Sequence, residues 1–153
     1  MSPDRPVLKI HRLRREGVAL PAYASEGAAG MDLSAALAEP LSLQPGERVA
    51  VPTGLVIALP AGHEGQVRPR SGLSFKRGIT VVNAPGTIDE DYRGEVKVLL
   101  VNLSREVQVI EPGDRIAQLV VAPVTRVEVV EVVSADALGE TERGSGGFGS
   151  TGR

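Results

Sequence analysis

The chain has 153 residues, of which 42% are hydrophobic and only 3% aromatic, so we expect one domain with an aliphatic core. A formal net charge of −2 argues against binding to nucleic acid or to an anionic membrane, because both need a basic surface. The absence of cysteine excludes disulfides, thiolate metal sites and cysteine nucleophiles, and it favours a cytoplasmic location. Residues 1–15 are charged throughout and do not resemble a signal peptide.

Short apolar runs separated by turn residues predict an all-β fold. Val and Ile favour pleated surfaces, and 18 Gly with 11 Pro leave little room for long helices. In chain order, the expected strands cover residues 7–13, 28–36, 41–43, 48–51, 53–59, 65–70, 79–82, 96–103, 107–110, 115–121 and 127–133. So many short strands are typical of a sandwich, a jelly roll or a similar fold.

Local signals refine three of these segments. Residues 7–13 alternate and are basic, which is typical of an edge strand. The pair Pro45-Gly46 predicts a hairpin that joins residues 41–43 to residues 48–51. One short helix is expected after Arg70, with Ser71 as its N-cap and Gly78 at its end. The start of that helix is a natural site for an anion, because its free N–H groups point outward.

Residues 83–95 form the most unusual stretch, between two expected strands. Pro85-Gly86 predicts a turn, in which Gly tolerates a positive φ at the second corner. Three acids, a phenol and a guanidinium follow closely, at Asp89, Glu90, Asp91, Tyr92 and Arg93. A solvated surface turn is the usual explanation for such residues, although this hairpin carries more functional groups than a connection needs.

The composition changes near residue 135, and residues 137–153 are expected to form a flexible, glycine-rich arm of the single domain 1–153. Phe148 lies among glycines, where it has no core to join. Glycine amides, hydroxyls, an arginine and one flat ring could together close over a nucleotide.

Five ordered segments resemble the motifs of the homotrimeric dUTP diphosphatases (dUTPases) of bacterial type. They cover residues 28–33, 69–73, 83–94, 113–119 and 143–152, whereas residues 1–27 carry no motif. The resemblance implies a jelly-roll-like β-clip fold that hydrolyses dUTP to dUMP and pyrophosphate, which limits uracil in DNA and supplies dUMP. It also implies a homotrimer whose active sites lie between subunits.

The resemblance assigns a role to each site residue. Asp89 would be the general base that activates water for attack on the α-phosphorus. Mg²⁺ would be held mainly by phosphates and water, with Asp32 as an indirect contributor. The remaining contacts to the nucleotide would come from Arg70, Ser71, Gly72, Asn83, Thr87, Ile88, Tyr92, Lys97, Gln118, Arg143, Phe148, Ser150 and Thr151.

The implied contacts divide by the part of the nucleotide that they bind. Asn83 and the backbone of residues 87–89 would read the uracil edge and the 3′-OH, and Tyr92 would leave no space for a 2′-OH. Gln118 would hold the α-phosphate side, and the helix start would bind further phosphates. From the arm, Phe148 would stack on uracil while its polar neighbours hold the β- and γ-phosphates.

Two alternatives remain at this point. A dCTP deaminase shares the fold but needs other polar groups around the base, and the hairpin with Asp89 and Tyr92 favours the diphosphatase. A catalytically silent nucleotide-binding β-trimer would not need the carboxylate of Asp89. Magnesium-dependent pyrophosphate release from dUTP distinguishes these alternatives.

Overall fold

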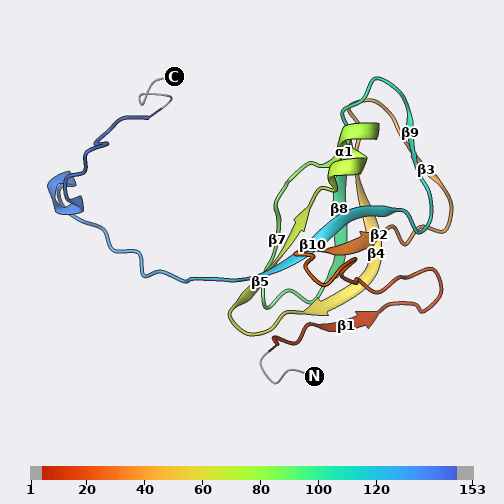
Figure 1. Cartoon of the computed structure of the whole chain (residues 1–153), viewed down its shortest axis with the longest axis horizontal. Helices are drawn as coiled ribbons and strands as arrows, with labels where there is room; N and C mark the ends of the chain where they lie inside the picture. Colours follow the sequence, from red (N-terminus) through yellow and green to blue (C-terminus); the bar gives the residue numbers. More distant parts are fainter. Residues whose placement is uncertain (1–4, 148–153) are drawn as a thin grey trace.

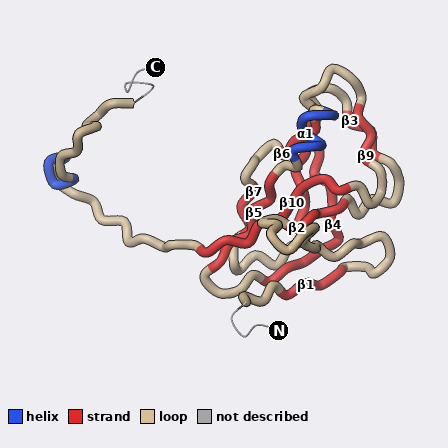
Figure 2. Tube along the Cα trace, viewed as in Figure 1, coloured by secondary structure: helices blue, strands red, loops and turns tan. Residues whose placement is uncertain are grey.

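Two four-stranded sheets and one two-stranded sheet make up the body of the protein (Figures 1 and 2). The computed structural model describes residues 5–147, and every strand pair in that range is antiparallel. The expectation of an all-β fold with one short α-helix is confirmed. Within residues 5–147, no helix is both long and apolar enough to cross a membrane.

The first sheet has the strand order β1-β4-β8-β6. Its members are β1 (Lys9–Arg12), β4 (Arg48–Ala58), β8 (Glu95–Asn102) and β6 (Ile79–Val81). β1 lies at the edge, as the basic alternation of residues 7–13 predicts. The two runs expected at residues 48–51 and 53–59 are one strand, β4, which is interrupted by a bulge between Pro52 and Val56.

The second sheet has the order β2-β10-β5-β7. It contains β2 (Met31–Ser34), β10 (Arg115–Pro123), β5 (His63–Arg68) and β7 (Gly86–Ile88). β6 and β8 pair as the two arms of the hairpin expected around residues 83–95. However, β7 leaves that hairpin and pairs with β5, so the central stretch connects the two sheets.

The prediction that the strands on either side of Pro45-Gly46 pair with each other as a hairpin is wrong. The turn exists, because the N–H of Glu47 donates to the carbonyl of Gln44 at 3.0 Å. Yet β3 (Leu41–Leu43) pairs with β9 (Gln108–Ile110), and β4 pairs with β1 and β8. Buried Asn102 explains the difference, since its amide nitrogen donates to the carbonyls of Leu43 and Glu106 at 2.8 Å each.

The core is aliphatic and takes side chains from all three sheets. Leu33, Leu55, Leu100, Ile110 and Leu119 are each no more than 1% exposed. β8 shows how the pattern works, because alternate positions from residue 96 to residue 100 are buried and those between them are exposed. The exposed face of this strand is therefore available to line a surface cavity.

The helix α1 (Ser71–Arg77) connects β5 to β6. Its N-cap is Arg70, in an extended conformation and without a side-chain capping bond, so the expectation that Ser71 is the N-cap is wrong. Ser71 is instead the first helical residue. Gly78 ends the helix in the left-handed region at φ 64°, as expected, and its N–H donates to the carbonyl of Ser74 at 3.0 Å.

After β10 the chain leaves the body as an extended arm (Figure 1). The strand expected at residues 127–133 is absent, and the only regular element of residues 124–147 is the 3₁₀ helix η1 (Ala135–Leu138). Valines in this segment are widely exposed, including Val129 at 90%. β-Branched residues favour a strand only where a neighbouring edge offers hydrogen bonds and packing, and the single chain supplies none here.

Candidate active site

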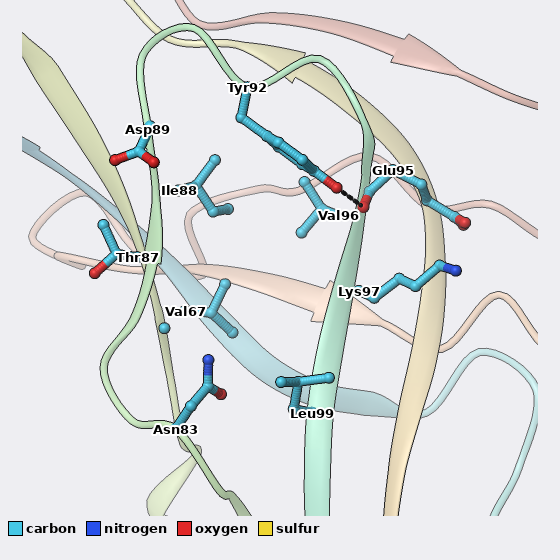
Figure 3. A pocket seen from close by; sticks show the side chains of 11 residues that line it. Val67, Asn83, Thr87, Ile88, Asp89, Tyr92, Glu95, Val96, Lys97 and Leu99 are labelled. Carbon is cyan, nitrogen blue, oxygen red and sulfur yellow. Dashed lines mark hydrogen bonds between the residues drawn. The ribbon is translucent and has the colours of Figure 1, made fainter.

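A cavity of about 230 Å³ opens beside β5, β7 and β8 (Figure 3). Six of the expected site residues line it together: Asn83, Thr87, Ile88, Asp89, Tyr92 and Lys97. Its floor is apolar, with side chains of Val67, Val96 and Leu99. The cavity thus combines an apolar base with polar groups at its rim, which is the usual composition of a small-molecule site.

Asn83 and Gly86 define one end of the cavity. Gly86 begins β7 opposite Val67 and does not adopt a positive φ, so the expected reason for a glycine at this turn is wrong. The preceding peptide bond, Ala84–Pro85, is cis. Space is the actual reason, because a Cβ on Gly86 would lie 3.1 Å from Nδ2 of Asn83. The glycine therefore allows the amide of Asn83 to lie against the backbone of β7.

Asp89 and Tyr92 lie at the other end, on the turn between β7 and β8. The N–H of Tyr92 donates to the carbonyl of Asp89 at 3.1 Å, which closes this turn. The phenol of Tyr92 donates to the carbonyl of Glu95 at 3.0 Å (Figure 3). A Cβ on Gly94 would lie 2.3 Å from the phenol oxygen, so only glycine leaves room for this ring. The Asp89 carboxylate stays exposed at the cavity rim.

Glu90 fixes the outer side of the same turn. Its carboxylate accepts the N–H of Gly62 at 2.8 Å and lies 3.9 Å from Arg126, where the arm begins. The guanidinium of Arg93 donates to the carbonyl of Glu90 at 2.7 Å. The turn that carries Asp89 is therefore held by side-chain bonds at its edge as well as by its backbone.

A second cavity, of about 390 Å³, lies where α1 begins beside β2 and β10. It brings together the expected residues Asp32, Arg70, Ser71, Gly72 and Gln118. Ser71 and Gly72 are exposed in the first turn of the helix, where backbone N–H groups have no partner within the helix. Positive charge, free amides and an amide side chain suit this cavity to an anion.

Asp32 connects two arginines in this second cavity. One carboxylate oxygen lies 2.9 Å from Nε of Arg70 in an ion pair, and the other accepts a hydrogen bond from Nη1 of Arg115 at 3.1 Å. Arg70 also donates to the carbonyl of Arg115 at 3.2 Å. Each oxygen of Asp32 is thus paired with a guanidinium group. Among the described residues, no group of three or more His, Cys, Asp or Glu side chains lies close enough together to hold a metal ion.

Arg115 lies at this site although its side chain was not among the residues expected there. It lies within the segment 113–119 that carries the fourth motif, but spacing alone does not reveal that it shares a carboxylate with Arg70. The available signal was its position at the start of an alternating strand, three residues before Gln118. On β10 and its bulge, this spacing brings the two side chains to the same cavity.

Gln118 faces the second cavity because its neighbours hold it there. Its amide nitrogen donates to the carbonyl of Pro69 at 2.9 Å. A Cβ on Gly30 would lie 2.5 Å from Oε1 of Gln118, so the glycine of the first motif leaves the space that this side chain occupies. An amide side chain among apolar strand residues needs hydrogen-bond partners, and the carbonyl of Pro69 is one for Gln118.

The two cavities share no lining residue in the described part of the chain. Arg143 lies on the arm and at neither cavity, and its Nε donates to the carbonyl of Gly146 at 2.8 Å. Phe148, Ser150 and Thr151 lie outside the described residues. One chain therefore presents separate parts of the expected site, with Asp89 and Tyr92 in one cavity and the arginines with Gln118 in the other.

These features define an all-β protein with one cavity suited to a small, partly apolar ligand and another suited to an anion. A family model described as dUTPase matches residues 16–152. The deoxyuridine 5'-triphosphate nucleotidohydrolase of Rhizobium etli (strain CIAT 652) is 62% identical over 151 residues, which cover 97% of this chain and 95% of the relative. That of Methylocella silvestris is 63% identical over 135 residues, covering 87% and 82%.

Solved structures agree with the sequence relatives. The dUTPase of Staphylococcus bacteriophage 80alpha with dUPNHPP superposes with a TM-score of 0.81 at 26% identity, covering 96% of this chain and 99% of that chain. The chain belongs to the dUTPase family.

Proposed function

We propose that this protein hydrolyses dUTP to dUMP and pyrophosphate, with its two cavities binding different parts of one nucleotide. The first cavity receives deoxyuridine, and the second receives the triphosphate. The observation that carries this proposal is the presence of Asp89 and Tyr92 at one cavity and of Arg70, Arg115 and Gln118 at the other. The names of the sequence relatives support the same reaction.

Selectivity for the base follows from the polar groups of the first cavity. Asn83 and the β7 backbone offer donors and acceptors to the uracil edge, and the amino group of cytosine would reverse one of these hydrogen bonds. A Cβ on Gly86 would lie 3.1 Å from Nδ2 of Asn83 and 3.4 Å from Cβ of Val67, so the backbone here is closely packed, and in this proposal that packing excludes the methyl group of thymine. Tyr92 packs against the deoxyribose and excludes a 2′-OH. Ile88 and Lys97 complete the nucleoside contacts in this proposal.

Asp89 acts as the general base in this proposal. Its exposed carboxylate at the cavity rim accepts a proton from a water molecule as the water oxygen bonds to the α-phosphorus. The bond from the α-phosphorus to the oxygen that bridges to the β-phosphate breaks in line, and pyrophosphate leaves. A carboxylate alone is a weak base, so positioning of the reactants and neutralisation of charge supply most of the rate.

The phosphate chain is bound by the second cavity. The guanidinium groups of Arg70 and Arg115 neutralise its charge, while Ser71 and Gly72 offer a hydroxyl and backbone N–H groups. Gln118 holds the side of the α-phosphate. From the arm, Arg143, Ser150 and Thr151 bind the β- and γ-phosphates, and Phe148 stacks on uracil.

Magnesium fits this arrangement as an ion held mainly by the substrate. The described residues form no cluster of three carboxylate or imidazole groups, and Mg²⁺ commonly keeps several waters and takes few protein ligands when it binds to phosphates. When bound, Mg²⁺ neutralises phosphate charge and fixes the conformation of the phosphate chain. Because both oxygens of Asp32 pair with arginines, Asp32 would reach the ion only through water. A related phage phi11 variant is described with a structural Mg(II) ion.

The site is completed by assembly into a homotrimer. Asp89 and Gln118 lie at cavities of one chain that share no residue, so each nucleotide lies between the first cavity of one copy and the second cavity of its neighbour. The exposed valines of residues 127–133 provide apolar surface for a contact between copies, and the arm can extend to a neighbouring chain. This is the assembly that the family resemblance implies.

The test is turnover of dUTP, dCTP, dTTP and UTP with Mg²⁺, with products separated by chromatography. We expect only dUTP to be consumed, giving dUMP and pyrophosphate. Conversion of dCTP to dUTP would instead identify a dCTP deaminase. Binding of dUTP without turnover would identify the silent binding protein.

A further inference from the structure

The bulge in β4 leaves backbone groups that need partners other than the strand ladder. Pro52 pairs with Lys97 and Val56 pairs with Glu95, so the three residues 53–55 of β4 lie opposite Val96 alone. A bulge of this kind interrupts the ladder and leaves N–H groups of the longer strand unpaired. Each such group must find another acceptor if it is shielded from water.

Glu95 supplies that acceptor for Gly54. Its Oε1 accepts the N–H of Gly54 at 2.9 Å. The hydroxyl of Thr53, which is 1% exposed, donates to the carbonyl of Val96 in the same bulge. Gly54 has little freedom to move away, because its N–H is held by Glu95 and its carbonyl accepts the N–H of Leu13 at 2.9 Å. The side chain of Glu95 therefore attaches the start of β8 to a fixed point on β4.

The backbone of the same residue holds Tyr92. The Glu95 carbonyl accepts the phenol hydrogen of Tyr92 at 3.0 Å, and this is the hydrogen bond drawn in Figure 3. The ring lies so close to Gly94 that its position depends on where the first residues of β8 lie. A displacement of the Glu95 backbone would thus move the phenol at the rim of the first cavity.

We propose that Glu95 is a positioning residue for sugar selectivity: its carboxylate anchors β8 to the β4 bulge, so that its carbonyl holds Tyr92 against the 2′ position of the sugar. This inference rests on the proposed function, in which Tyr92 excludes a 2′-OH. Glu95 itself need not touch the nucleotide. Its effect passes through the phenol of Tyr92, which makes the two residues thermodynamically coupled.

The experiment measures kcat/KM for dUTP and for UTP in Glu95→Ala, Glu95→Asp and Glu95→Gln. Alanine removes the carboxylate acceptor, and aspartate has a side chain too short to reach the Gly54 N–H. Both variants should therefore lower the ratio of kcat/KM for dUTP to kcat/KM for UTP by about five- to tenfold, the scale of one hydrogen bond. Glutamine keeps an oxygen that can accept the Gly54 N–H, and it should retain the wild-type ratio. Glu47→Ala is the matched control, because Glu47 also accepts a backbone N–H, that of Gln44 at 2.8 Å, on a turn that lines neither cavity. We expect this control to keep the ratio.

A double-mutant cycle with Tyr92→Phe tests the route of the effect. Tyr92→Phe alone should lower the ratio, and adding Glu95→Ala to it should produce no further change. An unchanged ratio in both Glu95→Ala and Glu95→Asp would overturn the inference, as would equal losses with and without the phenol. If Glu95→Ala does not fold, Glu95→Asp and Glu95→Gln still give the comparison. Failure of the wild-type protein to hydrolyse dUTP would overturn the proposed function instead.

Discussion

Asp32 lies between Arg70 and Arg115, and its two carboxylate oxygens lie 2.9 and 3.1 Å from nitrogens of the two guanidinium groups. Two cations that meet at one cavity repel each other unless an anion lies between them. Asp32 therefore keeps both arginines together before the substrate arrives. It is the residue on which the shape of the basic cavity depends.

Asp32→Asn should raise the KM for dUTP by about tenfold and change kcat less, because it loosens two arginines that bind substrate charge and leaves Asp89 in place. Steady-state kinetics at fixed ionic strength measures both constants. Asp136→Asn on η1, where the chain is exposed, is the matched control and should behave as the wild type. A change confined to kcat would contradict the positioning role of Asp32.

Asp89→Asn should lower kcat by about 10²- to 10⁴-fold, the usual contribution of a general base, while dUTP binding survives. Binding of a non-hydrolysable dUTP analogue can be measured by calorimetry. Asp91→Asn provides the control, since this neighbouring carboxylate does not line the first cavity. Wild-type turnover in Asp89→Asn would show that another group activates the water.

Mixing two inactive variants should restore activity if the nucleotide lies between copies. Asp89→Asn removes the general base from the first cavity, and Gln118→Ala removes the α-phosphate contact from the second. A mixed trimer regains some sites with both cavities intact. Activity of the two variants is measured after joint unfolding and refolding, against the same variants refolded separately, and light scattering reports the trimer. Activity no greater than the sum of the separate samples would contradict a shared site.

Asn102→Ala should lower the free energy of unfolding by roughly 3 kcal/mol, because it leaves buried carbonyls without donors. The wild-type side chain donates to Leu43 and Glu106 and accepts from both the N–H and the hydroxyl of Ser104. Urea denaturation measures the loss. Asn83→Ala is a useful comparison, since Asn83 is exposed and should affect nucleotide binding more than stability. A loss below about 1 kcal/mol would mean that water replaces the lost donors.

The local signals of the sequence predicted most strands, the end of α1 at Gly78 and the edge position of β1. Pairing was harder to predict, because a turn fixes the direction of the chain but not the partner of each strand. The turn around Gly46 is present, yet β3 pairs with β9. The side chain of Asn102, which lies far away in the sequence, donates to the carbonyl of Leu43 in β3. Residues 127–133 have the composition of a strand but no partner edge within one chain.

For the candidate site, the sequence predicted most of the residues but not the contacts between them. Asn83, Asp89 and Tyr92 do meet in one cavity, and Arg70 meets Gln118 in another. Arg115 was not assigned, because an ion pair across 83 residues of sequence cannot be read from spacing. The positions expected at Phe148, Ser150 and Thr151 remain predictions, since they lie outside the described residues.

Gly54 also has an evolutionary consequence. It has a φ of +68°, and a Cβ there would lie 2.5 Å from Cγ2 of Val18, so backbone conformation and packing independently oppose any replacement. A relative that carries alanine at this position should therefore also carry a smaller residue in place of Val18. The segment before residue 28 has none of the motifs, but through this contact and the bond from Leu13 its substitutions are expected to covary with those around the β4 bulge.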